Sequence, residues 1–239
     1  MCGRFTMTRS LEDLMLRFDL EDATGVSLRP NYNTAPGQQI AVVHVEPAGR
    51  VLSMMRWGLI PSWAKDPAVG FRMINARSET AAEKPSFRSA FRRRRCIIPA
   101  DGFYEWHKTT SGAKQPYLIG SQDQPLMALA GLWETWEDPE SGDDVDSATI
   151  LTTAANEFMS RIHDRMPVIL PDAASEQRWL DPDSDPRALG DLLAQYPGNR
   201  LRMHAVSTDV NSTRNNRADL VLPIAAGSGG LLDGIPDRG

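Results

Sequence analysis

The chain has 239 residues, 41% of them hydrophobic, which is enough for one ordinary hydrophobic core. Its formal net charge is −5 at pH 7, so the overall charge gives no support to nucleic-acid binding. No apolar run is long enough to span a membrane, the first residues lack the apolar segment of a secretory signal, and the two cysteines and four histidines show no disulfide framework or zinc-ligand spacing. We therefore expect a cytoplasmic protein without membrane contact, metal or organic cofactor.

Hydrophobic periodicity and turn residues predict short helices inserted among strands in the first half of the chain. A capping box at Ser10 and apolar residues at helical spacing predict a helix at 10–19. The turn-rich stretch 31–38 is expected to be a loop, and the segments on either side of 46–49 a β-hairpin. The prolines and glycines of 58–75 predict an ordered loop, with a helix following Asn75.

The second half is richer in strands. Residues 96–108 predict a broken strand pair, 137–147 a polar hairpin tip, and 172–196 two short helices. Further strands are expected at 116–120, 125–136, 147–155, 166–170 and 201–207. Because the strands form hairpins rather than alternating with helices, the class is α+β, a single compact domain at 1–223 around a curled antiparallel sheet with short flanking helices. The Gly-rich tail 224–239 is expected to be disordered.

Arginine is unusually abundant and unevenly placed. Of the 26 lysines and arginines, four are lysine. Many arginines fall between Arg72 and Arg95, with four in succession at 92–95, whereas much of the acidity lies in 134–146 and 181–191. A GC-rich genome also favours arginine codons, so composition alone leaves two interpretations open. The distribution is compatible with a basic face on an acidic protein.

Cys2 directly follows the initiator methionine, in a context that methionine aminopeptidases trim. Without Met1 the residue carries a free α-amine beside its thiol, and such an amine has an ordinary pKa of about 7.7–8.0. It can attack an aldehyde to form a Schiff base, after which the thiol can close a thiazolidine ring. Two alternatives are a thiolate that attacks an acyl carbon and a cysteine that merely packs at the chain end.

Three polar residues outside the terminus have settings that suit chemistry. Glu105 lies between two aromatic residues of an expected strand, where a raised pKa favours general acid–base work. His163 precedes an apolar strand in a His-Asp-Arg cluster that could orient its imidazole. Asn75 lies with Arg77 at an expected loop-to-helix junction, where Arg77 could hold a phosphate. The structural alternatives are an exposed strand Glu, a turn His, and an Asn helix cap beside a solvated Arg.

Aromatic residues supply a further signal. Trp57 and Trp63 flank a proline-bounded turn, and an exposed Trp beside Arg suits stacking on the bases of single-stranded nucleic acid. At least three of the six tryptophans are nevertheless expected in the core, as is the thiol of Cys96.

Each signal is weak alone, but together they resemble one family. The chain contains, in order, MCGRF, YNTAP, WGLIPSWAKD, INARSET, CIIPADGFYEW, ILTTAAN, HDRMPVIL and VSTDVNSTRN. These motifs resemble the SOS-response-associated peptidase (SRAP) family, from residue 1 to about residue 223. The resemblance implies a compact α+β domain around an antiparallel, barrel-like sheet.

The same resemblance implies a function in the DNA damage response. SRAP proteins recognise abasic sites in single-stranded DNA and bond to them covalently. The matching residues are Cys2 as nucleophile, Asn75 as a positioning group, Glu105 as acid and base, and His163 as a second proton-transfer group. The matching DNA-binding positions are Arg4, Pro36, Trp63, Arg77, Trp106 and Thr152. No cofactor is required, and we expect a monomer that associates with the nucleoid when bound to DNA.

Two other functions fit parts of the pattern. Cys2, His163 and Asn75 are the residue types of a thiol peptidase, whose activity could be limited to self-processing. A plain single-strand-binding module would need only the tryptophans and arginines. The covalent function best explains a terminal cysteine, because a peptidase nucleophile has no need of an adjacent free amine.

Overall fold

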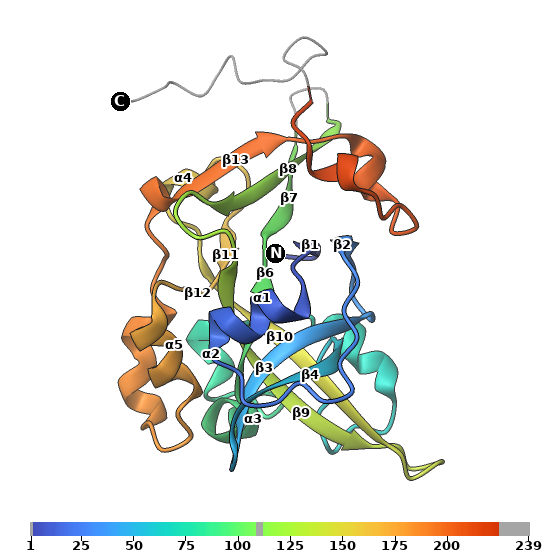
Figure 1. Ribbon diagram of the computed structural model, residues 1–239, viewed down its shortest axis with the longest axis vertical. Helices are drawn as coiled ribbons and strands as arrows, with labels where there is room; N and C mark the ends of the chain where they lie inside the picture. The colour runs from blue at the N-terminus through green and yellow to red at the C-terminus, as the bar shows by residue number, and fades with distance from the viewer. Residues whose placement is uncertain (1, 109–111, 225–239) are drawn as a thin grey trace.

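The computed structural model describes residues 2–108 and 112–224. Within these ranges the strands form two sheets that share one main hydrophobic core (Figure 1). The first sheet has the strand order β13-β8-β7-β1-β2. Its strands are β1 (Phe5–Met7), β2 (Asn31–Thr34), β7 (Gly102–Lys108), β8 (Lys114–Ser121) and β13 (Leu201–Ala205).

The second sheet closes on itself. It runs β11-β10-β4-β3-β6-β9-β12, and an additional β10–β9 pairing joins β10, β4, β3, β6 and β9 into a closed five-stranded barrel. A short strand, β5, pairs with β10 outside this path. The strands are β3 (Gln39–Glu46), β4 (Gly49–Trp57), β5 (Asn75–Arg77), β6 (Arg95–Ala100), β9 (Met127–Glu137), β10 (Asp144–Ala154), β11 (Arg165–Pro167) and β12 (Ile169–Leu170).

Short helices and 3₁₀ turns surround the sheets. The α-helices are α1 (Leu11–Phe18), α2 (Ser78–Ala81), α3 (Arg88–Arg93), α4 (Glu157–Ser160) and α5 (Ala173–Leu180). The 3₁₀ turns are η1 (Pro67–Arg72), η2 (Pro186–Leu193), η3 (Gly198–Arg200), η4 (Thr208–Asn211) and η5 (Ala218–Val221). The helix α1 begins with the expected capping box, because Ser10 and Asp13 each accept the other's backbone N–H at 3.1 Å.

A buried ion pair joins α1 to α5. Arg17 binds both carboxylate oxygens of Glu176, at 2.6 and 3.0 Å, and the Glu176 side chain is buried. Such a bidentate contact fixes the relative position of the two helices. It therefore holds α5 close to the N-terminal segment.

Most of the expected elements are present, with differences that have a physical cause. The curled α+β sheet is confirmed as a barrel, although β10 pairs in parallel with both β4 and β5, so the sheet is mixed. The loop expected at 31–38 is wrong for Asn31–Thr34, which form β2. The helix expected after Asn75 begins only at Ser78, because Asn75–Arg77 pair with Ile150–Thr152 as strand.

Other expectations concern the core and the tail. Trp57, Trp136 and Trp179 are buried, as is the thiol of Cys96, which confirms that at least three tryptophans and this thiol lie in the core. Trp57 is therefore not the tryptophan of its turn that is free to stack on a base. The tail expected to be disordered lies, apart from Ile224, outside the described residues. No helix in the described part of the chain is long and apolar enough to cross a membrane.

Candidate functional site

Cys2 lies fully buried just before β1, in the main core with Phe5 and Phe103. Its Sγ lies 3.9 Å from the carbonyl oxygen of Arg4. Burial raises the pKa of the Cys2 thiol far above its ordinary value, and the negative charge of Glu105 raises it further. The thiol is therefore neutral at physiological pH.

Asn75 on β5 contacts Cys2 directly. Its Nδ2 donates a hydrogen bond of 2.8 Å to the Cys2 carbonyl oxygen. Its Oδ1 is buried and accepts no hydrogen bond from any described residue. The alternative interpretation of Asn75 as a helix cap is wrong, because the residue before α2 is Arg77. A buried carbonyl without a donor is costly, so this oxygen is suited to accept from a bound hydroxyl or amine.

Glu105 lies on β7, beside the N-terminal segment. The strands β1 and β7 are antiparallel with Phe5 opposite Phe103, and this register brings residue 3 opposite Glu105. The Glu105 side chain is buried rather than exposed, with 3% of its surface accessible. The interpretation as an exposed strand Glu is therefore wrong. The charge of Glu105 acts on the Cys2 thiol and the Asn75 amide binds the Cys2 carbonyl, so residues of both sheets act on Cys2.

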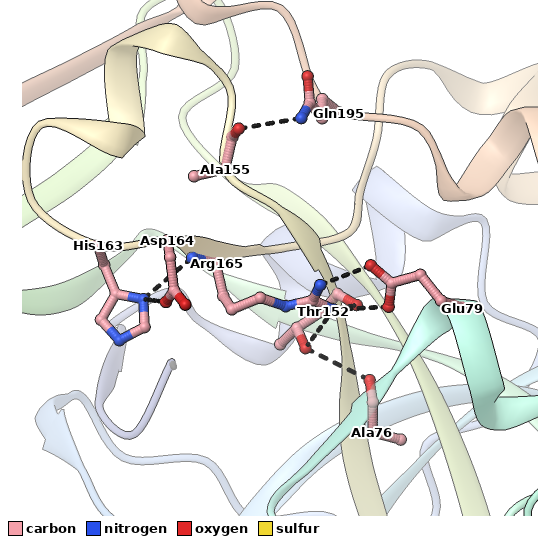
Figure 2. Close-up of polar contacts among 8 residues, drawn as sticks. All are labelled: Ala76, Glu79, Thr152, Ala155, His163, Asp164, Arg165 and Gln195. Carbon is pink, nitrogen blue, oxygen red and sulfur yellow. Dashed lines mark hydrogen bonds and ion pairs between the residues drawn. The ribbon is translucent and has the colours of Figure 1, made fainter.

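His163 precedes β11 and is fixed through Nδ1. This nitrogen accepts a hydrogen bond of 3.0 Å from the Arg165 N–H and lies 2.8 Å from Asp164 Oδ1 (Figure 2). The two contacts require opposite protonation of Nδ1, since the backbone bond needs a lone pair and the carboxylate needs a proton. Asp164 is exposed to solvent, whereas the Arg165 N–H belongs to β11, so the backbone bond is the more rigid of the two and fixes the ring. The neutral tautomer then carries its proton on Nε2.

Arg165 links three elements of the site, as Figure 2 shows. Its guanidinium binds Glu79 of α2 at 2.5 and 2.8 Å and donates to the Thr152 carbonyl at 2.5 Å. The Thr152 hydroxyl in turn donates to the Ala76 carbonyl at 3.5 Å. Thr152, expected to contact DNA, is fully buried beneath this network. The sequence analysis assigned Glu79 no role, because a single glutamate in a short helix has no distinctive pattern.

The loop between β4 and β5 presents two aromatic side chains to solvent. Trp63 is 62% exposed and Phe71 56% exposed, and the Arg56 guanidinium lies 4.9 Å from the centre of the Phe71 ring. Sequence analysis expected Trp63 here but missed Phe71, since periodicity does not reveal burial in a loop.

Two glycines and a tryptophan hold this loop against the barrel. A Cβ added to Gly58 would lie 2.5 Å from the Gly70 carbonyl oxygen, and Gly58 has a φ of +124° that favours glycine. Trp136 Nε1 donates to the Ala64 carbonyl at 2.7 Å. The loop bearing Trp63 and Phe71 is thus anchored at both ends and in the middle.

Arg4 and Trp106 lie in a second, smaller cluster. Arg4 Nη1 donates to Asn33 Oδ1 at 2.6 Å and to the Val210 carbonyl at 2.8 Å. The Arg4 guanidinium lies 5.9 Å from the Trp106 ring centre, and Trp106 Nε1 donates to Asn211 Oδ1 at 2.7 Å. Because successive residues of a strand face opposite sides, Trp106 points away from the side of Glu105.

The remaining expected positions are near the surface. Pro36 is half-buried in a turn, and its neighbour Gly37 lies so close to Phe71 that an added Cβ would be 2.9 Å from the ring. Arg77, at the end of β5, is exposed. The described residues contain no group of three or more His, Cys, Asp or Glu side chains arranged to hold a metal ion.

Comparison with known proteins identifies the family. The model of the family described as SOS response associated peptidase (SRAP) matches residues 1–213. The chain belongs to the SRAP family. It is 44% identical over 223 residues to the abasic site processing protein YoqW of Bacillus subtilis (strain 168), covering 92% of this chain and 99% of YoqW.

Other SRAP relatives are more distant. The abasic site processing protein YedK of Escherichia coli (strain K12) is 33% identical over 232 residues, covering 94% of this chain and all of YedK. The abasic site processing protein HMCES of Xenopus tropicalis is 33% identical over 265 residues, covering 94% of this chain and 78% of HMCES. A crystal structure of a protein from Bacteroides thetaiotaomicron has a TM-score of 0.86 at 25% identity, covering 94% of this chain and all of that one. The SRAP fold found here therefore agrees with a solved structure.

Proposed function

We propose that this protein recognises abasic sites in single-stranded DNA and forms a covalent crosslink to them through Cys2, which shields the lesion during the DNA damage response. The main support is that residues of two different sheets act on Cys2: Asn75 binds its carbonyl, and the charge of Glu105 affects its thiol. The relatives named as abasic site processing proteins support the same function.

The reaction joins the Cys2 amine and thiol to one carbon of the opened sugar. After removal of Met1, the amine attacks the C1′ aldehyde, and loss of one water gives an imine. The thiol sulfur then bonds to the imine carbon, and its proton passes to the nitrogen to give a neutral thiazolidine. Because burial keeps the thiol protonated, the thiol itself carries the proton that the ring nitrogen needs.

The surrounding residues act on the sugar and on the protons. Glu105 assists ring opening and transfers protons during imine formation. Asn75 holds the Cys2 carbonyl through Nδ2, and its Oδ1 accepts a hydrogen bond from the hydroxyl released when the sugar ring opens. His163 protonates a leaving oxygen or assists reversal of the link, through the proton on Nε2.

The DNA strand is held by exposed residues around this centre. Arg77 binds a phosphate, and Trp63 stacks on a base with Phe71 and Pro36 beside it. Arg4 and Trp106 are half-buried and lie on the other side of β7 from Glu105, so they contact the strand only where it runs past that side, with the arginine oriented by Asn33. Thr152 contributes from beneath the surface by positioning Arg165.

Thiol peptidase activity is less well supported. A cysteine protease uses a thiolate stabilised by a neighbouring imidazolium, which lowers the pKa of the thiol. Here the pKa of the Cys2 thiol is raised, and its described hydrogen bond goes to a backbone carbonyl. The only peptidase activity that stays compatible with this site is self-processing that exposes Cys2.

Substitution of Cys2 separates the candidate functions. Cys2→Ser keeps the amine and removes the thiol, so it should form an imine that borohydride traps but no adduct that survives heating without reductant. Cys96→Ser is the matched control, and it should retain the heat-stable adduct. A heat-stable adduct in Cys2→Ser would overturn the thiazolidine. Unaltered DNA binding with no adduct in any variant would favour a plain binding module.

A further inference from the structure

The four successive arginines before β6 divide into two pairs with different environments. Arg94 binds Glu134 Oε2 at 2.5 Å. Arg95 is buried, with Nε donating to the Trp179 carbonyl at 2.7 Å and Nη1 to the Phe91 carbonyl at 3.0 Å. These two arginines hold α3 and the end of α5 against the barrel, so their role is structural.

The other pair belongs to an exposed group of cations. Lys84, Arg88, Arg92 and Arg93 are exposed, and in the described part of the chain their side chains make no ion pair or hydrogen bond. The Arg88 N–H donates to the Lys84 carbonyl at 2.9 Å, so a single hydrogen-bonded turn holds Lys84 next to the start of α3. This turn is not part of the helix, because Phe87 has a φ of −125°. Arg88 and Arg92 lie one helical turn apart on α3, and Lys84 lies in the turn that precedes them. We call these three residues the basic stripe.

The cations of the basic stripe do not stabilise the folded protein through any described contact. Arg88 and Arg92 carry like charges four residues apart on one helix, so they repel one another. The nearby Glu83 is exposed and forms no described ion pair with any of the three. The opposite side of the helix, with Phe87 and Phe91, is buried in the core, and this burial is what holds α3 in place. The repulsion is thus unrelieved in the free protein.

We propose that the basic stripe binds the sugar–phosphate backbone of the single strand that leaves the abasic site. A row of cations suits a row of phosphates, and the guanidinium contacts phosphate oxygens in pairs. No large aromatic side chain is exposed on α3, so the stripe reads no bases and its binding is independent of sequence. This proposal rests on the proposed function, in which single-stranded DNA binds at Arg77.

Chain continuity places the stripe within reach of the site. Arg77 ends β5, α2 follows at once, and the Lys84 N–H donates to the Thr80 carbonyl at 3.0 Å. Seven residues separate Arg77 from Lys84, so their Cα atoms are at most about 25 Å apart. A strand that passes Arg77 and has a sufficiently long flank can therefore reach the stripe.

The test compares two substituted proteins on two lengths of DNA. One variant carries Lys84→Gln, Arg88→Gln and Arg92→Gln; the control carries Arg29→Gln, Arg187→Gln and Arg202→Gln, three exposed arginines without described partners. The DNA holds a tetrahydrofuran abasic analogue, which has no aldehyde and cannot crosslink. One strand has about 5 nucleotides, and the other has about 25 with a flank on one side of the lesion.

The stripe variant should bind the long strand more weakly. With three phosphate contacts removed, the slope of log K against log[salt] should become less steep by about 2, while binding of the short strand and the control variant stay unchanged. The loss should occur with the flank on one side of the lesion only. An unchanged slope, or an equal loss in the control, would overturn the proposal. It would also be overturned if polyglutamate displaced the protein from the long strand as well as unlabelled single-stranded DNA does. Crosslinking of a short abasic strand tests the proposed function separately, because the stripe does not reach it.

Discussion

The side-chain amide of Asn75 donates a 2.8 Å hydrogen bond to the backbone carbonyl of Cys2. This bond joins β5, which pairs with the barrel strand β10, to the segment that leads into β1 of the other sheet. It fixes the Cys2 carbonyl group next to the α-amine that removal of Met1 exposes. The terminal amine therefore has a defined position before DNA binds.

Removing this bond should slow the chemistry more than it weakens binding. Asn75→Ala should reduce the rate of crosslinking at saturating DNA by about tenfold or more, because the nucleophile loses its orientation. Single-turnover rates and the affinity for an uncrosslinkable analogue are the measurements. Asn156→Ala is a matched control, since Asn156 also donates a buried side-chain hydrogen bond, 2.6 Å to the Tyr196 carbonyl. A loss of affinity with an unchanged rate would contradict the positioning role.

The two buried thiols predict how stability depends on pH. Burial raises the pKa of both Cys2 and Cys96, so each stays protonated in the folded state after the unfolded chain has lost that proton. Stability should therefore fall as the pH rises above about 8.5, by up to about 1.4 kcal/mol per pH unit for each thiol. Urea unfolding between about pH 8 and 9.5 measures this fall. The range stays below the ordinary pKa of tyrosine, so ionisation of tyrosine does not contribute. The fall should be smaller in Cys96→Ala, and an equal fall in that variant would exclude the Cys96 thiol as a cause.

Glu79 should oppose DNA binding while it holds Arg165 in place. Its carboxylate is half exposed, and the hydrogen bond from Arg165 lowers its pKa. Glu79→Gln removes a negative charge beside Arg77 and frees Arg165 for a phosphate. Affinity for single strands should rise, and the salt slope should steepen by about 0.7. Asp191→Asn, which breaks the exposed Arg178–Asp191 pair on α5 and η2, is the control and should change neither quantity.

Lower affinity in Glu79→Gln would instead mean that Arg165 binds phosphate only when the carboxylate positions it. Arg165 is largely buried and Glu79 is half exposed, so loss of this pair should also lower stability measurably. The midpoint of urea unfolding measures this loss in each variant.

Asn33 should be required for stability. Its Nδ2 donates to the carbonyls of Val210, Ser212 and Asn215 at 2.8–3.2 Å, and its Oδ1 accepts from Arg4. Asn33→Ala leaves several buried groups without partners, so the free energy of unfolding should fall by about 2–4 kcal/mol. Proteolysis within 207–217 should also become faster than in the native protein. Unchanged stability would show that solvent replaces these bonds.

The sequence pattern predicted those helices and strands whose caps, turns and apolar spacing are contained in one short segment. The capping box placed α1, and alternating apolar residues placed the β3–β4 hairpin and most later strands. Motif resemblance selected Cys2, Asn75 and Glu105, and the structure brings these three residues together.

Pairing between segments that are far apart in the chain could not be predicted from the sequence. The strand β5 exists because Asn75–Arg77 pair in parallel with residues 150–152, some 75 positions away in the chain, and nothing in the local pattern marks such a partner. The strand β2 resembles a loop because its Asn and Thr residues favour turns, yet it pairs with β1. The separation of Arg4 and Trp106 from the side of Glu105 likewise depends on how β7 pairs with β1.

Crosslinking through Cys2 can be read from the intact mass of the native protein after incubation with a single strand that carries one abasic site, followed by heating without reductant. We expect one adduct, with the mass of the protein without Met1 plus the DNA minus one water. It should be absent with an intact-base strand and absent in Cys2→Ala. No adduct from protein with Met1 removed, or an adduct that persists in Cys2→Ala, would contradict the account.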